Sequence, residues 1–338
     1  MFHPAAGLLL LGAVPIAPTT GSDTLSGRIE EARFVTLGGI EQWITIRGDD
    51  LRNPILVLLH GGPGDVQSPL VSTYRPYERD FVLVQWDQRG AGKTYGRYGD
   101  ATPDLTLDRV AKDGIELATY LERRFPHNRI VLLGHSWGTA IGTKMVLSRP
   151  DLFAAYVGTG QIASWSESVH AQFDFLREKA RDDRNAALLA QLDSIGRPDP
   201  MNASQYFAFT RPLRRYLDPS DSAWLAGLRD RLIHAPGYTE ADWAALGKGM
   251  ELSGRTFLPT QMRETLSTSA LRFELPYFVI QGRDDRFTPT APAAAYFAKV
   301  RAPKKRMVVI EDAGHFALAT HAEQFVAVLK ELLGSISP

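Results

Sequence analysis

The chain has 338 residues, of which 44% are hydrophobic, so it can bury a sizeable core as one large domain or two. Lysine plus arginine and aspartate plus glutamate number 38 each, and this balance argues against nucleic acid or anionic lipid as partners. The absence of cysteine excludes disulfides, thiolate nucleophiles and cysteine-ligated metals. A small or neutral ligand is therefore the expected partner.

The N-terminus, residues 1–27, reads as an apolar leader. Its apolar stretch at 5–14 has the length of a signal-peptide core and is too short to span a bilayer, so no stable membrane span is predicted. No lysine or arginine precedes Arg28, and prolines crowd the expected cleavage site. Export by a weak signal peptide and a cytoplasmic location both stay open.

Short β-rich runs then alternate with glycine-rich loops and helical patterns, which predicts a mostly parallel, twisted α/β sheet with flanking helices. The expected strands are 33–39, 42–48, 55–59, 81–86, 130–134, 154–160, 276–282 and 306–312. The first two form an antiparallel pair around Gly38 and Gly39. One helix is predicted over 106–125, with Thr106 as its N-cap, and another over 321–334.

The sheet is interrupted between its sixth and seventh predicted strands. Residues 164–272 lack strong strand runs and are rich in aromatic side chains, and a segment this long is not a simple loop. We therefore expect a helical cap over one edge of the sheet. The expected α/β core is 28–163 together with 273–338.

The segment Gly134-His135-Ser136-Trp137-Gly138 fits the pattern G-x-S-x-G between a predicted strand and a predicted helix. In that context the serine sits on a sharp turn with its hydroxyl exposed above the sheet. A serine hydroxyl is a weak nucleophile near neutral pH, so it needs a base, and the base needs a carboxylate to fix its tautomer. Ser136 is thus the candidate nucleophile.

Candidates for the two partners follow later strands at the same edge of the sheet. His315, in EDAGHFA, is the predicted base. The acid is Asp285 or Asp284, both in QGRDDRFTP, and we favour Asp285 because Pro289 places a turn four residues on. The chain order Ser, Asp, His is the order expected for this arrangement.

Two glycine-rich segments invite other readings. HGGPGD (60–65) lacks the third glycine of a dinucleotide fingerprint. GAGKT (90–94) resembles part of a Walker A loop, but Asp87 stands where the first glycine belongs and no helical pattern starts at Lys93. Nucleotide binding is not predicted. Asp87 and Arg89 are instead expected to form a buried structural pair.

Three segments together, HGGPG (60–64), WDQRGAGKT (86–94) and GHSWGT (134–139), resemble the α/β-hydrolase superfamily. Within it they are most similar to the proline iminopeptidase-like serine peptidases. The resemblance is strong over residues 33–160, follows 273–334 in outline and does not extend to the predicted cap.

This resemblance implies an α/β-hydrolase fold and cleavage of an acyl bond through an acyl-enzyme intermediate. It also implies that the backbone N–H groups of Gly62 and Trp137 form the oxyanion hole. In such peptidases acidic cap residues receive the amino group of an N-terminal proline. Glu251 and Glu240 are the candidates here.

Three functions remain open from the sequence. The first is an aminopeptidase for peptides with N-terminal proline or a small residue, and the second is an esterase, lactonase or amidase for a hydrophobic small molecule. The third is a ligand-binding protein on a hydrolase scaffold. No cofactor and no metal is implied, because the histidines and carboxylates do not show ligand spacing.

Overall fold

A computed structural model describes residues 27–335. The leader predicted at 1–27 lies, apart from Gly27, outside the described residues. Within residues 27–335, none of the helices combines the length and the apolar character that crossing a bilayer requires.

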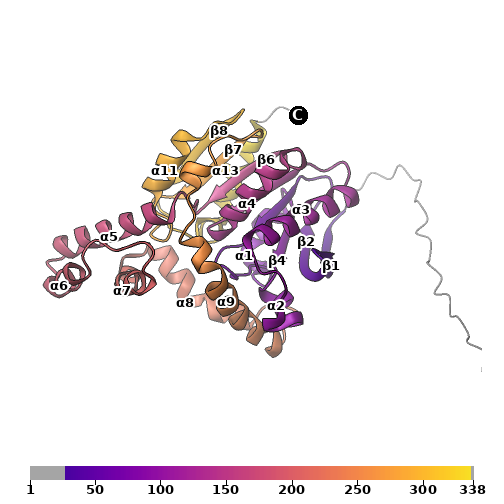
Figure 1. The fold of residues 1–338 in the computed structure, drawn as a ribbon. Helices are drawn as coiled ribbons and strands as arrows, with labels where there is room; N and C mark the ends of the chain where they lie inside the picture. The colour runs from indigo at the N-terminus through magenta and orange to yellow at the C-terminus, as the bar shows by residue number, and fades with distance from the viewer. Residues whose placement is uncertain (1–26, 336–338) are drawn as a thin grey trace, which may run out of the picture.

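In the described part of the chain, eight strands form one sheet in the order β1-β2-β4-β3-β5-β6-β7-β8 (Figure 1). The pairs β1–β2 and β2–β4 are antiparallel, and the other neighbours are parallel. The strands are β1 Ile29–Leu37, β2 Ile40–Gly48, β3 Ile55–Leu59, β4 Val82–Asp87, β5 Ile130–His135, β6 Ala155–Thr159, β7 Tyr277–Gly282 and β8 Lys305–Ile310. All eight predicted strands and the mostly parallel sheet are confirmed.

Helices cover both faces of this sheet. The α-helices in the described part of the chain, including those between β6 and β7, are α1 Val71–Glu78, α2 Gly92–Tyr98, α3 Leu107–Arg124, α4 Trp137–Ser148, α5 Trp165–Asp182, α6 Ala186–Ile195, α7 Ala203–Leu213, α8 Pro219–Ile233, α9 Glu240–Gln261, α10 Leu266–Ser269, α11 Thr290–Lys299, α12 Ala317–Thr320 and α13 Ala322–Gly334. The predicted N-cap is confirmed, because the side chain of Thr106 accepts a hydrogen bond from the backbone N–H of Arg109 at 3.2 Å.

Strand β3 shows how the core is divided between the two faces. Ile55, Val57 and Leu59 pack in the cluster that includes side chains of α3 and α4. Leu56 and Leu58 pack on the opposite face with residues of α1 and α13. Because successive side chains of a strand point to opposite faces, a fully apolar run is what a strand buried on both sides requires.

Two expectations for the loop after β4 are wrong. Helix α2 begins at Gly92, although no helical pattern was expected there. Asp87 and Arg89 are both buried, but they do not pair with each other. Arg89 Nε donates to Asp113 of α3 at 2.7 Å, while Asp87 accepts from the hydroxyl of Ser68 at 2.5 Å. The partners come from distant segments, which a local pattern cannot reveal.

Helices α5 to α10 lie between β6 and β7, and we call residues 164–272 the helical insertion. Figure 1 shows α5, α6 and α7 extending away from the sheet, and α9 lying beside α2. Most aromatic and aliphatic side chains of α5, α6 and α7 pack against one another in a small core of their own. That this insertion acts as a cap stays a prediction.

Candidate active site

Ser136 lies at the turn between β5 and α4. Its backbone has φ 51° and ψ −119°, a conformation that side-chain-bearing residues rarely adopt. Its N–H donates to the carbonyl of Thr159 at 3.0 Å, which ties the turn to the end of β6. The strained strand-to-helix turn expected for G-x-S-x-G is therefore present, with the serine at its apex.

Close packing explains the glycines on either side of Ser136. A Cβ atom at Gly138 would lie 2.2 Å from the carbonyl oxygen of Leu59, and one at Gly134 would lie 2.7 Å from the carbonyl oxygen of Gly138. Both obstacles are backbone atoms, which cannot rotate out of the way. Side chains at these positions would thus force β5, the turn and β3 apart.

The loop after β3 lies directly against this turn. A Cβ atom at Gly61 would come within 3.1 Å of the Cβ of Ser136. The next residue, Gly62, has φ +107° and lines the pocket in front of Ser136. Trp137 is the first residue of α4, and a backbone N–H at that position has no acceptor within its own helix. The two predicted oxyanion donors thus flank Ser136, and their role stays a prediction.

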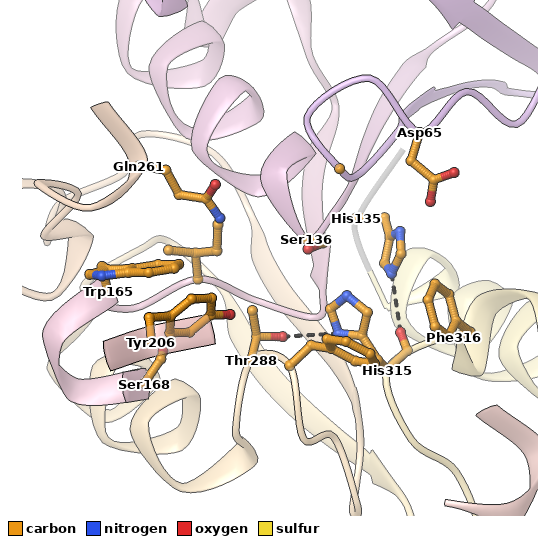
Figure 2. Close-up of a pocket in the computed structure, with 13 residues that line it drawn as sticks. Asp65, His135, Ser136, Trp165, Ser168, Tyr206, Gln261, Thr288, His315 and Phe316 are labelled. Carbon is orange, nitrogen blue, oxygen red and sulfur yellow. Dashed lines mark hydrogen bonds between the residues drawn. The ribbon is translucent and has the colours of Figure 1, made fainter. Parts of the chain in front are cut away.

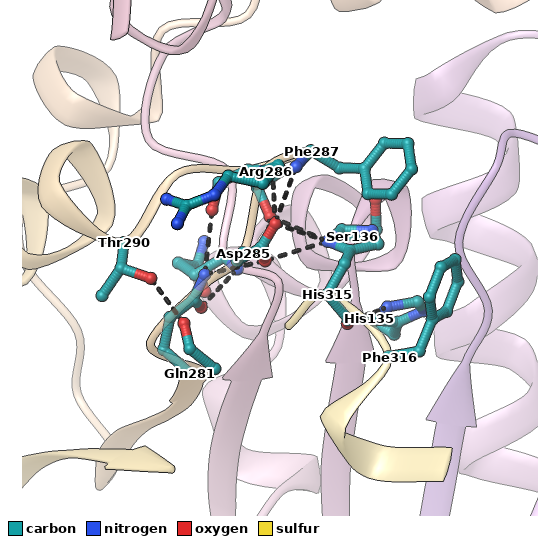
Figure 3. A network of polar contacts seen from close by, with 12 residues as sticks. His135, Ser136, Gln281, Asp285, Arg286, Phe287, Thr290, His315 and Phe316 are labelled. Atoms are coloured by element: carbon teal, nitrogen blue, oxygen red, sulfur yellow. Dashed lines mark hydrogen bonds and ion pairs between the residues drawn. The ribbon is translucent and has the colours of Figure 1, made fainter. Parts of the chain in front are cut away.

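His315 follows β8 and lies beside Asp285, which follows β7 (Figure 3). The Nδ1 atom of His315 is 2.9 Å from Oδ2 and 3.0 Å from Oδ1 of Asp285. Because a carboxylate accepts, Nδ1 carries the proton, and in the neutral ring Nε2 is the nitrogen that can accept one. Asp284 is paired with Arg286 at 2.5 Å instead.

Asp285 is held by several donors besides His315. Its Oδ1 accepts from the backbone N–H groups of Phe287 at 2.9 Å and Thr288 at 2.8 Å. Its Oδ2 accepts from the Thr288 hydroxyl at 2.8 Å and from the side-chain amide of Gln281 at 3.0 Å. A buried carboxylate that accepts this many hydrogen bonds is held in a fixed orientation.

A second carboxylate reaches His315 from the helical insertion. Asp221, in the first turn of α8, is fully buried and accepts from the backbone N–H of His315 at 2.6 Å and of Phe316 at 3.0 Å. A Cβ atom at Gly314 would lie 2.1 Å from Asp221 Oδ2, so the approach also needs that glycine. The loop that carries His315 is therefore fastened to α8.

Burial and charge act in opposite directions on His315. Burial lowers the pKa of the imidazole, but the carboxylates of Asp285 and then Asp221 raise it by more, so the pKa lies above its usual value. His135 behaves differently: burial holds the pKa of its imidazole well below the usual range. Its Nε2–H therefore donates, as a neutral ring, to the carbonyl of His315 at 3.1 Å.

Ser136 and His315 face a common cavity of about 200 Å³ (Figure 2). Within residues 27–335 the hydroxyl of Ser136 makes no hydrogen bond to His315. Such contacts are often long without substrate and tighten when it binds. The other residues that line the cavity include Trp165, Ser168, Tyr206, Gln261, Phe287, Thr288 and Phe316. Of the aromatic residues in the helical insertion, only Trp165 and Tyr206 reach it.

The two predicted amine-binding glutamates lie elsewhere. Glu240 is the first residue of α9 and Glu251 lies further along the same helix; both are exposed, and neither lines the cavity. The carboxylate that does line it is Asp65, directly after HGGPG. Burial raises the pKa of Asp65 to about 6, partly offset by the charge of His315. Substrate binding by Glu240 and Glu251 stays a prediction.

A model of the alpha/beta hydrolase family matches residues 56–328, which is well over half of the chain. The chain belongs to the alpha/beta hydrolase family. The sheet order, the strand-to-helix turn at Ser136 and the expected fold class agree with this assignment. As a member of this family it is a hydrolase.

Peptidases are prominent among the relatives of this alpha/beta hydrolase. The probable aminopeptidase YbaC of Bacillus subtilis is 26% identical over 284 residues, which cover 83% of this chain and 89% of that protein. The proline iminopeptidase of Heyndrickxia coagulans is 23% identical over 322 residues, which cover 93% of this chain and 98% of that protein. The structure of the Mycobacterium smegmatis proline iminopeptidase matches with a TM-score of 0.62 at 18% identity, covering 90% and 98%, a likeness of fold alone.

Sequence reasoning about this alpha/beta hydrolase missed two residues that line the cavity, Asp65 and Trp165, and one that holds the backbone of His315, Asp221. Asp65 could have been found, because it directly follows HGGPG in a loop already expected beside Ser136. Asp221 gave no usable signal, since an acid in the first turn of a helix is ordinarily a solvated partner of the helix dipole. Trp165 opens α5, and its orientation depends on how the helical insertion folds back.

Proposed function

We propose that this hydrolase is an aminopeptidase that releases N-terminal proline or another small residue from peptides, with Ser136, His315 and Asp285 as its catalytic triad. One observation supports this most. The Nδ1 atom of His315 lies 2.9 Å from Asp285, and His315 lines the same cavity as Ser136. A volume of about 200 Å³ is below the roughly 300–1,000 Å³ of pockets for drug-sized ligands, which favours a small acyl group.

In the proposed mechanism, Ser136 Oγ attacks the carbonyl carbon of the scissile amide while His315 Nε2 takes the hydroxyl proton. The negative charge on the former carbonyl oxygen is stabilised by the N–H groups of Gly62 and Trp137, each worth about 3 kcal/mol in the transition state. Collapse of this intermediate breaks the C–N bond, and His315 gives its proton to the departing amine. The product is an ester on Ser136.

Water then completes the proposed cycle. His315 takes a proton from a water molecule that attacks the ester, and the oxyanion again forms opposite Gly62 and Trp137. When the ester bond breaks, the proton returns from His315 to Ser136 Oγ. The acyl group leaves as a carboxylic acid, and the enzyme is restored.

Labelling with a fluorophosphonate and a panel of aminoacyl 4-nitroanilides tests this function. The wild type should take up one label and release 4-nitroaniline fastest from the prolyl or alanyl substrate, and Ser136→Ala should lose both properties. Ser168→Ala removes another serine that lines the cavity and should keep the label. A Ser136→Ala variant with normal activity would contradict the mechanism.

A hydrolase for small esters, lactones or amides is the second candidate. It is favoured by the positions of Glu240 and Glu251, which are exposed on α9 and do not line the cavity. The relatives also include the putative carbamate hydrolase RutD of Escherichia coli, at 26% identity over 287 residues. Faster turnover of uncharged 4-nitrophenyl esters than of any aminoacyl anilide, after allowance for the better leaving group, would support this candidate.

A further inference from the structure

Asp65 sits in the same short loop as Gly62, immediately beyond the HGGPG segment. Its backbone N–H donates to the carbonyl of Gly61 at 3.2 Å, so the loop folds back on itself as a tight turn. A Cβ atom at Gly64 would come within 3.0 Å of Met250 and Ser253 of α9, so α9 packs directly over the turn. The turn thereby presents Asp65 to the cavity, where the residue is half-buried.

The carboxylate of Asp65 has no partner within residues 27–335. Burial raises the pKa of this carboxyl group, and the charge of His315 partly offsets the rise. The fully buried aspartates are different, because each has specific donors. Asp87 accepts from Ser68 and a backbone N–H, Asp113 pairs with Arg89 and Arg109, and Asp221 and Asp285 each accept several hydrogen bonds.

The Asp65 carboxylate is partly buried at the cavity wall, so it loses part of its hydration without gaining a donor from the protein. The residues that line this cavity include no lysine or arginine, and Asp65 is the carboxylate among them. A ligand in the cavity that brings N–H or O–H donors would therefore find the Asp65 carboxylate free to accept them. A cationic donor satisfies the group best, because hydrogen bonds between charged partners are the stronger ones.

We propose that Asp65 binds the positively charged amino group of the substrate's N-terminal residue, so that the hydrolase acts on free N-termini and excludes blocked ones. This rests on the proposed aminopeptidase function. The amino nitrogen is two bonds from the carbonyl carbon that Ser136 would attack, so its receptor must lie close to the oxyanion donors. Asp65 lies three residues beyond Gly62. One loop would thus bind both the amino group and the carbonyl oxygen of the substrate's N-terminal residue.

The geometry of the cavity fits amine binding by Asp65 next to acyl attack by Ser136. In Figure 2, Ser136 lies between Asp65 on one side and Trp165 and Tyr206 on the other. Trp165 and Tyr206 offer an apolar surface, while Asp65 offers charge beside the rings of His135 and Phe316. With Asp65 as the receptor, a free amine can be bound without Glu240 or Glu251, whose side chains are exposed outside the cavity.

Binding to a catalytically silent enzyme tests the proposal without depending on turnover. Prolyl-glycinamide and its uncharged isostere cyclopentanecarbonyl-glycinamide are titrated calorimetrically into Ser136→Ala at pH 8, where a group with pKa about 6 is ionised. The amine should bind at least tenfold more tightly. Adding Asp65→Asn should reduce this preference to less than threefold, whereas adding Glu251→Gln should preserve it.

Three results would overturn the proposal: no preference for the amine in Ser136→Ala, a preference that survives Asp65→Asn, or one that Glu251→Gln abolishes instead. Should Asp65→Asn fail to fold, judged by its melting curve, Asp65→Ser replaces it with a smaller uncharged side chain. Wild-type hydrolysis of prolyl 4-nitroanilide is measured separately. If it is absent while the Asp65-dependent preference persists, the peptidase function fails and the amine site stands.

Discussion

Asp221 holds the backbone of His315, at 2.6 Å between the carboxylate and the N–H, from a helix that lies 94 residues earlier in the chain. The same carboxylate accepts from Phe316, so two consecutive peptide groups are fixed. Because α8 belongs to the helical insertion and His315 lies on the loop after β8, the insertion and the α/β core meet at the proposed base. Any displacement of α8 is therefore transmitted to the imidazole.

Replacing Asp221 by asparagine should lower kcat about tenfold or more, since a small misplacement of a catalytic group is enough for such a loss. The amide can accept one of the two hydrogen bonds, but its NH2 group opposes the other N–H. Loss of the negative charge also lowers the pKa of His315, so the acid limb of kcat/KM should move to lower pH. A purely structural role would leave that limb in place.

The matched control for Asp221 is Asp218→Asn at the N-cap of the same helix. The Asp218 side chain accepts from the N–H of Ser220, and asparagine caps helices as well as aspartate. This variant should keep the wild-type pH profile and kcat. Equal losses in the two variants would mean that α8 itself, rather than the contact with His315, determines activity.

The pH dependence of the reaction should follow His315. As the proposed base, the imidazole must be neutral, so kcat/KM should fall as the pH drops through its pKa, which lies above the usual value of 6.5. Asp285→Asn should lower kcat by about 10⁴ and move the limb to lower pH, because the carboxylate fixes the tautomer and stabilises the imidazolium. Asp284→Asn, which alters only the pair with Arg286, should do neither. The opposite pattern would make Asp284 the acid.

Gly138→Ala should destabilise the protein by about 3 kcal/mol, at the upper end of overpacking in a rigid core. The new methyl group would lie 2.2 Å from the carbonyl oxygen of Leu59, a backbone atom. Gly254→Ala is the comparison, since a Cβ there meets nothing within 4 Å and α9 should gain about 0.5–1 kcal/mol. Urea denaturation measures both, and equal midpoints would refute the packing explanation.

Arg89→Met should cost about 3 kcal/mol of unfolding free energy, because it leaves Asp113 buried with fewer cationic partners. Both side chains of this pair are fully inaccessible. Arg97→Met breaks the surface pair with Glu41, where both side chains are more than two-fifths exposed, and should change stability by less than about 1 kcal/mol. Similar denaturation midpoints for the two variants would show that the buried pair contributes no more than an exposed one.

The fold and the centre of the candidate site were accessible from sequence because their signals are local. A strand such as β3, buried on both faces, appears as an unbroken apolar run, and the turn at Ser136 has its own glycine pattern. Asp221 and the partner of Arg89 could not be found in this way. In a helix sequence, a buried acidic residue looks the same as a surface one. What distinguishes Asp221 and Asp113 is contact with residues 94 and 24 positions away, His315 and Arg89.

The hydrogen bond between the ring of His135 and the carbonyl of His315 joins residues 180 positions apart. A nascent chain that has completed β5 and its turn still lacks β7 and β8, which supply the other half of the site. Such non-local contacts form late and make folding slow, because the intervening chain must be ordered first. A chain truncated before β8 retains Ser136 but lacks His315, the proposed base, so the proposed active site can be complete only after the last strand has been synthesised.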